Sequence, residues 1–255
     1  MVEVTTDEIP MYRSGGSPGG DPPATLLVLW DIDHTLLDAG GVGQQIYAAA
    51  VRQATGRSLA EPWRFDGRTE LAAAADALVA VGLDPDETRI GVFLEALVTE
   101  TRSRARDMVT HGRALPGAAE ALSALSTLPG VRQSVLTGNI YPIAALKLSS
   151  FGLDGHLDLR IGAYGTDAEL RTDLPLHAFD RAERHFGVRY GGENTVVVGD
   201  TLRDVATAQA VGARAVAVAT GETPAAALAA AGADVVLPDL ADTGAVLKAI
   251  TGRTG

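Results

Sequence analysis

The chain has 255 residues, of which 46% are hydrophobic, and a formal net charge of −11 at pH 7. This length is enough for one large α/β domain or for one domain with an insertion. Because the chain has no cysteine, a disulfide scaffold and a thiolate metal site are excluded. The acidic balance disfavours nucleic acid and anionic membranes as partners. No apolar run approaches the length that spans a bilayer and no signal-peptide pattern opens the chain, so we expect a cytoplasmic location.

The first 23 residues contain few apolar side chains and become rich in glycine and proline after position 14. Such a segment cannot bury enough surface to offset the entropy that it loses on ordering. We therefore expect residues 1–23 to form a flexible tail that takes no part in chemistry.

An apolar run over residues 26–30 follows, and it ends in two carboxylates, Asp31 and Asp33. A short apolar run without glycine or proline is typical of a buried parallel strand. In open α/β sheets, ligands bind at the carboxyl ends of such strands. Two carboxylates this close repel each other unless a cation or a shared proton relieves them. In the alternative interpretation Asp33 simply begins a turn, and this segment alone does not separate the two.

A helical unit comes next, and the glycines between positions 40 and 43 are interpreted as a hinge that leads into it. Asp84 is the expected N-cap of the last long helix in this unit, with Pro85 as its first residue. No strand pattern occurs here, so we expect residues 40–111 to form a separate helical domain. The predicted helices are Gln44–Thr55, Glu70–Val81 and Pro85–Arg106.

From residue 112 onwards, strand and helix patterns alternate. This alternation predicts an α/β core domain, residues 24–39 and 112–255, built on a doubly wound parallel sheet of Rossmann-like type with helices on both faces. Strands are predicted at 131–136, 157–161, 195–199, 215–219 and 234–237, and helices at 118–128, 142–151, 174–186, 206–210 and 224–231.

Three of the predicted strands end in groups that can bind a metal ion or a phosphate. The carboxyl ends of parallel strands lie at one edge of the sheet, so such groups can converge although they are far apart in the sequence. The residues concerned are Asp31 and Asp33, Thr137 and Asn139, and Asp200 and Asp204.

These segments resemble the motifs of a known family. Asp31-Ile32-Asp33-His34-Thr35 is similar to the Asp-x-Asp-x-Thr signature of the haloacid dehalogenase superfamily, whose members are mostly phosphohydrolases. Thr137-Gly138-Asn139 resembles its second motif, and the segment from Gly199 to Asp204 resembles its fourth, Gly-Asp-x-x-x-Asp. The order and spacing agree over residues 25 to about 237. The helical unit is similar to the small cap of the phosphoglycolate phosphatase-like subgroup, and Gly67-Arg68-Thr69 fits the pattern of that subgroup.

The resemblance implies a role for each acid. Asp31 would be the nucleophile that forms an aspartyl-phosphate, and Asp33 would be the general acid and base. Mg²⁺ would be held by the Asp31 carboxylate, the Asp33 carbonyl and Asp200, with Asp204 as a ligand or just behind the ligands. Taken alone, Asp204 is better interpreted as a surface acid.

The resemblance also implies a phosphate-binding group. Thr137, Gly138 and Asn139 would hold phosphate oxygens near a helix N-terminus. Arg68 could reach over the site from the cap and bind a substrate anion. Taken alone, Thr137 is better interpreted as a helix cap, and Arg68 as an exposed surface residue.

The chain departs from the family pattern at two positions. His34 stands where the family often has glycine, and a histidine there must accept whatever backbone conformation the turn demands. The third motif usually supplies a lysine, and the only lysines here are Lys147 and Lys248. We align Arg171 with this position in preference to Lys147, because an arginine can hold a carboxylate and a phosphate by charge-assisted bonds.

The sequence as a whole favours a Mg²⁺-dependent phosphatase that acts on a small phosphorylated metabolite. A sugar phosphate mutase of the same family has the same motifs and stays open as an alternative. A phospholigand-binding or regulatory protein without turnover is the alternative from another class. Neither the particular substrate nor the oligomeric state can be identified from the sequence.

Overall fold

The computed structural model describes residues 26–59 and 67–252. The tail expected over residues 1–23 lies outside these ranges. The strands are β1 (Leu26–Trp30), β2 (Leu37–Asp38), β3 (Arg113–Ala114), β4 (Val131–Val135), β5 (Thr195–Gly199), β6 (Arg214–Val218) and β7 (Val235–Leu237). The α-helices are α1 (Val42–Thr55), α2 (Glu70–Ala80), α3 (Glu87–Ser103), α4 (Ala105–His111), α5 (Ala118–Ser126), α6 (Tyr141–Ser150), α7 (Leu174–Phe186), α8 (Leu202–Val211), α9 (Ala225–Ala230) and α10 (Thr243–Thr251).

Five strands form one parallel sheet in the order β4-β1-β5-β6-β7. In this sheet Trp30 of β1 is in register with Val135 of β4 and with Val198 of β5. The chain segments that leave these three strands therefore start side by side at the same edge. This register is what brings the predicted site residues together.

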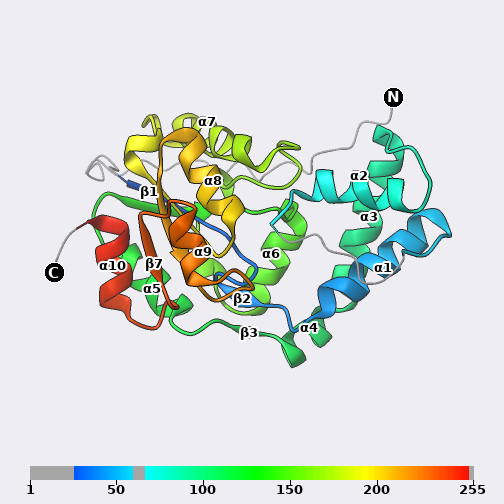
Figure 1. Cartoon of the computed structure of the whole chain (residues 1–255), viewed down its shortest axis with the longest axis horizontal. Helices are drawn as coiled ribbons and strands as arrows, with labels where there is room; N and C mark the ends of the chain where they lie inside the picture. The colour runs from blue at the N-terminus through cyan, green and yellow to red at the C-terminus, as the bar shows by residue number, and fades with distance from the viewer. Residues whose placement is uncertain (1–25, 60–66, 253–255) are drawn as a thin grey trace, which may run out of the picture.

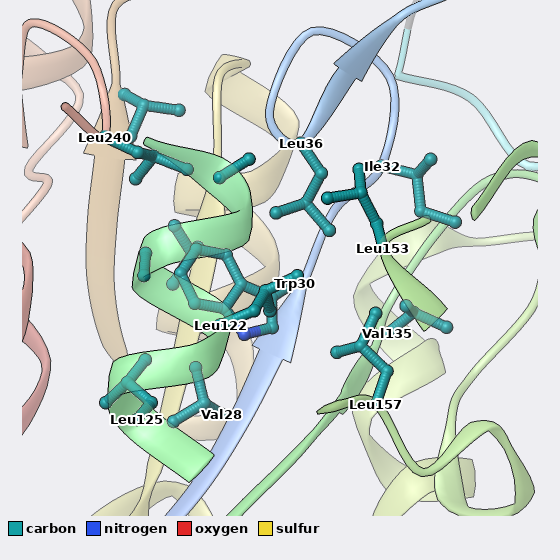
Figure 2. Packing of buried hydrophobic residues seen from close by; sticks show 14 of the residues in the cluster. Val28, Trp30, Ile32, Leu36, Leu122, Leu125, Val135, Leu153, Leu157 and Leu240 are labelled. Atoms are coloured by element: carbon teal, nitrogen blue, oxygen red, sulfur yellow. The ribbon is translucent and has the colours of Figure 1, made fainter. Parts of the chain in front are cut away.

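Helices cover both faces of the sheet, as Figure 1 shows. Val28 and Trp30 of β1 pack with apolar side chains of α5 and α10, whereas Leu27 and Leu29 point the other way and pack with α7. On this second face α8 and α9 cover β5 and β6. In Figure 2 the Trp30 ring extends from β1 towards α5, and Trp30 and Leu122 belong to the same buried cluster. The doubly wound α/β fold predicted from the sequence is confirmed.

One predicted strand is wrong. Residues 157–161 do not form a strand, because the structure has a 3₁₀ turn, Leu159–Ile161, in their place. The Asp158 carboxylate accepts a hydrogen bond from the Arg160 backbone N–H (3.1 Å) and holds the turn. Isolated contacts reach β4 and the residue after it: the Asp158 N–H donates to the Gln133 carbonyl, the Ser134 hydroxyl donates to the Asp158 carbonyl (2.7 Å), and Ala163 forms an isolated bridge with Leu136.

Residues 42–111 form four helices, α1 to α4, within the part of this stretch that the structure describes. We call them the helical insertion; in Figure 1 they lie beside the sheet and its flanking helices. Asp86, not Asp84, is the N-cap of α3: its carboxylate accepts a hydrogen bond from the Arg89 N–H (2.9 Å), and Pro85 precedes the cap. The division of the chain into two domains stays a prediction.

The insertion is joined to the sheet and its flanking helices in two ways. The two chain connections pair as the antiparallel strands β2 and β3. In addition, Ile140 and Ile143, at the start of α6, pack into the apolar cluster of the insertion with Phe93 and Leu97 of α3. No helix in the described ranges is both long and apolar enough to cross a membrane.

Candidate active site

Three carboxylates meet at the carboxyl edge of the sheet. Asp31 follows β1, Asp200 follows β5, and Asp204 lies in the first turn of α8. Carboxylate oxygens of the three lie within 4.8 Å of one another, and all three residues are buried. The convergence expected from the strand order is therefore present in the fold.

Asp204 is oriented by the start of its own helix. Thr201 is the N-cap of α8, and its hydroxyl and backbone N–H both donate to Oδ2 of Asp204, at 2.6 and 3.0 Å. The Asp204 carboxylate lies so close to Gly199 that a Cβ there would come within 2.3 Å of the carboxyl carbon. The glycine of the Gly-Asp motif is thus needed for close approach.

Arg171 lies against the nucleophile candidate. Its Nη2 donates to Oδ1 of Asp31 (2.7 Å) and to Oδ1 of Asp204 (2.6 Å), and its Nε also donates to Asp204 (3.1 Å). The residue is 7% exposed, so these charge-assisted bonds are shielded from water. The short 3₁₀ helix that carries Arg171 (Arg171–Asp173) packs on α8.

Lys147 also reaches the site, which the alignment of Arg171 alone did not anticipate. Its Nζ lies 2.8 and 2.7 Å from the two carboxylate oxygens of Asp33 and 2.8 Å from Oδ1 of Asn139. Arg171 and Lys147 are therefore not alternatives. Each cation serves a different carboxylate, Arg171 that of Asp31 and Lys147 that of Asp33.

The loop after β4 supplies Thr137, Gly138 and Asn139. The Asn139 side chain donates from Nδ2 to Oδ2 of Asp33 (2.7 Å) and to the Thr137 hydroxyl (2.9 Å). The Asn139 backbone N–H donates to the same hydroxyl (3.1 Å). The predicted phosphate-binding loop thus lies beside the acidic pair, and α6 begins directly after it.

Glu70 is a site residue that the sequence reasoning missed. This first residue of α2 sends its carboxylate to the Ile140 backbone N–H (2.6 Å), and its own N–H donates to the Gly138 carbonyl (2.9 Å). The insertion is therefore held on the loop that carries Asn139. The sequence signals only the start of a helix at Thr69 and Glu70, so nothing in it points to this contact.

Arg68 lines the site but forms an ion pair with Asp76 of α2. A cavity of about 580 Å³ opens over the carboxylates. Asp31, Asp33 and Lys147 line this cavity together with apolar residues from the insertion and α6, among them Ile46 and Met108. This volume is in the range that small-molecule ligands need.

His34 has a φ of 59°, so it adopts the left-handed conformation that its place in the motif led us to consider. Among the described residues it is the only residue other than glycine with a positive φ. Its side chain is exposed and lines the cavity, and its carbonyl accepts a hydrogen bond from the Thr220 hydroxyl.

The electrostatics of the site favour a cation. Burial raises the pKa of Asp31 to about 7, although Arg171 opposes this shift, and Asp204 adds to it. Burial, together with Asp31 and Asp204, raises the pKa of Asp200 to about 8. The pKa of Asp33 is lowered, because the Lys147 ammonium and the Asn139 hydrogen bond outweigh the effect of its burial. A hard divalent cation would relieve the repulsion between Asp31 and Asp200.

The oxygens available to such a cation belong to Asp31 and Asp200. Both oxygens of Asp204 accept hydrogen bonds from Arg171 or Thr201. Asp31 uses Oδ1 for Arg171, and Asp200 uses Oδ1 for the Thr35 hydroxyl (3.3 Å). Hydrogen bonds from the described residues do not reach Oδ2 of either one. These two side chains fit Mg²⁺, and Asp204 fits a place just behind them.

The comparisons with known proteins match one part of the chain to a family and most of the chain to a fold. A family model described as HAD-hydrolase-like matches residues 175–243, which run from α7 to the first residue of α10. Over these residues the match agrees with the resemblance to the haloacid dehalogenase superfamily. No curated protein matches the chain by sequence.

Solved structures share the fold over most of the chain. A hydrolase from Pseudomonas syringae is 21% identical, with a TM-score of 0.65 over 86% of this chain and 95% of that one. A predicted phosphoglycolate phosphatase from Haemophilus somnus is 20% identical, with a TM-score of 0.62 over 86% and 95%. A protein from Bacteroides vulgatus, provisionally assigned as a β-phosphoglucomutase, is 19% identical, with a TM-score of 0.65 over 90% of each chain. At these identities the likeness shows the fold.

Proposed function

We propose that the protein is a Mg²⁺-dependent phosphatase that hydrolyses a small phosphorylated metabolite through an aspartyl-phosphate on Asp31. The observation that carries this proposal is the meeting of Asp31, Asp200 and Asp204 around the Arg171 guanidinium, with Asp33 two residues after Asp31. A nucleophile, a cation site and an acid–base group then lie in one cavity. A cytoplasmic location is part of the proposal.

The reaction has two steps, and both use the same two acids. An Asp31 oxygen attacks phosphorus in line, and the bond between phosphorus and the leaving oxygen breaks. Because the pKa of Asp33 is lowered, its carboxylate first takes the proton of a singly protonated phosphate ester and then gives that proton to the leaving oxygen. Asp33, now a carboxylate, takes a proton from water as the water oxygen attacks the aspartyl-phosphate. Inorganic phosphate leaves and Asp31 is restored.

Mg²⁺ would be held by the carboxylates of Asp31 and Asp200 and by the Asp33 carbonyl. When bound, it supplies positive charge that offsets the repulsion between carboxylates and phosphate. Arg171 keeps the Asp31 carboxylate in place by a hydrogen bond to Oδ1 (2.7 Å). With Mg²⁺ and Arg171 both favouring its charged form, Asp31 is ionised and nucleophilic.

The phosphate would be held by the loop after β4. The Thr137 hydroxyl accepts two hydrogen bonds from Asn139, so its own proton is available for a phosphate oxygen. The backbone N–H of Gly138 would donate to a second oxygen. Arg68 would bind a substrate anion after leaving Asp76, which costs little because this pair is partly exposed.

A mutase that transfers phosphate to a sugar is the second candidate, because a protein assigned to that activity shares the fold over 90% of this chain. Water and a sugar hydroxyl compete for the same aspartyl-phosphate, so the products separate the two activities. A phosphatase releases inorganic phosphate without a sugar acceptor. A mutase interconverts two sugar phosphates and releases little.

The first test is phosphate release from p-nitrophenyl phosphate by the wild type and by Asp31→Asn, with Mg²⁺ and with a chelator. We expect turnover only in the wild type with Mg²⁺, and a loss of at least about a thousandfold in kcat for the variant. Asp180→Asn, at an exposed position on α7, is the matched control and should behave as the wild type. Turnover by Asp31→Asn, or full activity in chelator, would contradict the proposal.

The absence of turnover under every condition would favour a different function. Interconversion of hexose phosphates would then identify the mutase. Binding of phosphorylated ligands without any turnover would identify a regulatory protein.

A further inference from the structure

The hydrogen bonds of Lys147 exclude it from binding substrate. A lysine ammonium has three protons to donate. In this structure they face three acceptors, the two oxygens of Asp33 and Oδ1 of Asn139, at 2.7 to 2.8 Å. The side chain is 13% exposed. Lys147 therefore has no proton left for a phosphate or for another substrate anion.

Asn139 closes the arrangement into a triangle. Its Oδ1 accepts from Lys147, and its Nδ2 donates to Oδ2 of Asp33. Each pair among Lys147, Asp33 and Asn139 is thus joined by a hydrogen bond. A carboxylate held at both oxygens by two side chains has little freedom to rotate about its χ angles.

Asp33 nevertheless keeps access to the cavity. Its side chain is 36% exposed, whereas that of Lys147 is largely covered, and both residues line the cavity. Oδ2 accepts from both Lys147 and Asn139, whereas Oδ1 accepts from Lys147 alone, so Oδ1 keeps a lone pair for the proton that is transferred. This is the arrangement expected of a carboxyl group that must be oriented towards the leaving oxygen in order to transfer a proton to it.

The other cation of the site cannot do the same work. The Arg171 Nε and Nη2 donors are used by Asp31 and Asp204, and Arg171 forms no hydrogen bond to Asp33. Lys248, the only other lysine of the chain, lies near the end of α10, on the covering layer of the sheet.

We propose that Lys147 is a positioning residue, which holds the Asp33 carboxyl group in the direction required to protonate the leaving oxygen. This inference rests on the proposed phosphatase function. It assigns different tasks to the two cations: Arg171 orients the nucleophile, and Lys147 orients the acid.

The proposal has a chemical signature. When the bond between phosphorus and the leaving oxygen breaks, the leaving oxygen takes its proton from Asp33. A weakly basic leaving group such as p-nitrophenolate departs without this proton, whereas a strongly basic alkoxide needs it. If the Asp33 carboxyl group is wrongly oriented, the hydrolysis of phosphate esters of basic alcohols must therefore slow more than the hydrolysis of esters of acidic phenols.

The test compares kcat/KM of wild type and Lys147→Met for p-nitrophenyl, phenyl and benzyl phosphate, with Mg²⁺ present. This constant reports the first chemical step, before the aspartyl-phosphate reacts with water. We expect a loss of about tenfold or more for benzyl phosphate, a smaller loss for phenyl phosphate and less than about twofold for p-nitrophenyl phosphate. Asp33→Asn should give the same order with larger losses.

Three controls keep the result interpretable. Lys248→Met removes the other lysine and should leave all three constants unchanged. Lys147→Arg keeps the charge and should recover part of the loss for benzyl phosphate. Thermal unfolding of each variant checks the fold, and Lys147→Leu, which also lacks a donor, replaces Lys147→Met if that variant does not fold.

An equal loss for all three esters would overturn the inference, because it would place Lys147 in substrate binding or in stability. No loss for any ester would overturn it as well. If the wild type hydrolyses none of them, the phosphatase proposal itself fails. The two failures are therefore distinguishable.

Discussion

At the scale of the residue, Glu70 shows how one side chain links the insertion to the site. Burial raises its pKa to about 8, although the hydrogen bond from the Ile140 N–H and the charge of Lys147 oppose the shift. Asp33 adds to it. Burial raises the pKa of Tyr47, and Glu70 adds to that shift in turn. A carboxyl group whose pKa is higher in the folded than in the unfolded state contributes stability that is fully present at low pH.

We predict that Glu70→Gln makes stability less dependent on pH. In the wild type, the contribution of Glu70 is lost as the pH rises from its ordinary value of 4.5 through about 8. Glutamine does not ionise and can still accept from the Ile140 N–H, so the variant should lose about 1–3 kcal/mol less over this window. Urea unfolding in chelator at pH 5 and pH 8.5 measures the difference. Asp31 and Asp200 are present in both proteins, so the comparison isolates the contribution of Glu70, and parallel pH curves would contradict the prediction.

At the scale of the element, the two connections between insertion and sheet domain depend on glycine for two different reasons. Gly40 has a φ of 69°, and a Cβ there would come within 2.4 Å of the His111 carbonyl carbon. Gly41 has a φ of 75° but open space around its Cβ position. Gly112, with an ordinary φ, would bring a Cβ within 2.4 Å of the Asp38 carbonyl oxygen. The close approach of the two connections explains why positions 40 and 112 have no side chain. That these glycines act as a hinge stays a prediction.

The neighbouring glycines offer a matched pair of variants. Gly41→Ala should cost only the strain of a positive φ, about 1–2 kcal/mol. Gly40→Ala adds a clash with backbone that cannot move freely, so we expect a cost of about 3 kcal/mol or more and a displaced β2–β3 pair. Chemical denaturation of both variants gives the two values. Equal costs would show that the close approach at Gly40 is relieved without strain.

At the scale of the whole molecule, the site concentrates negative charge within a protein that is already acidic. The net charge of the chain is −11, and Asp31, Asp200 and Asp204 lie together at the carboxyl edge of the sheet. Burial of like charges without a metal ion opposes folding and lowers the free energy of unfolding. A bound divalent ion removes this loss of stability. Binding of the ion to the folded state alone must then stabilise the entire domain.

We predict that Mg²⁺ raises the thermal midpoint of the wild type. At a concentration tenfold above the dissociation constant, the gain is about 1.4 kcal/mol, or roughly 3–6 °C for a chain of this size. Asp200→Asn should remove most of the shift, and Asp180→Asn should retain it. Calorimetry in chelator and in increasing Mg²⁺ makes the measurement. A shift of equal size in all three proteins would mean that the ion acts elsewhere.

Several elements were predictable from local sequence because their apolar pattern matches what the fold buries. The bounds of β5 and α7 agree with the prediction residue for residue, since β5 is apolar on both faces and α7 has one apolar side. Residues 157–161 alternate between apolar and polar side chains, as a half-buried strand does. A strand, however, also needs a neighbouring strand with which to pair along its length. Here the chain turns at Asp158, and only isolated hydrogen bonds reach β4.

The sequence by itself determined the α/β class, the strand ends that carry the acids and the resemblance of their motifs to a known superfamily. These properties depend on short-range patterns, which are legible in one chain. Only the tertiary structure decided that Arg171 and Lys147 both reach the site, that Glu70 fastens the insertion to the loop after β4, and which acid each cation serves. Those contacts join residues 70 to 140 positions apart, and they follow from strand order and register, to which local sequence gives no direct access.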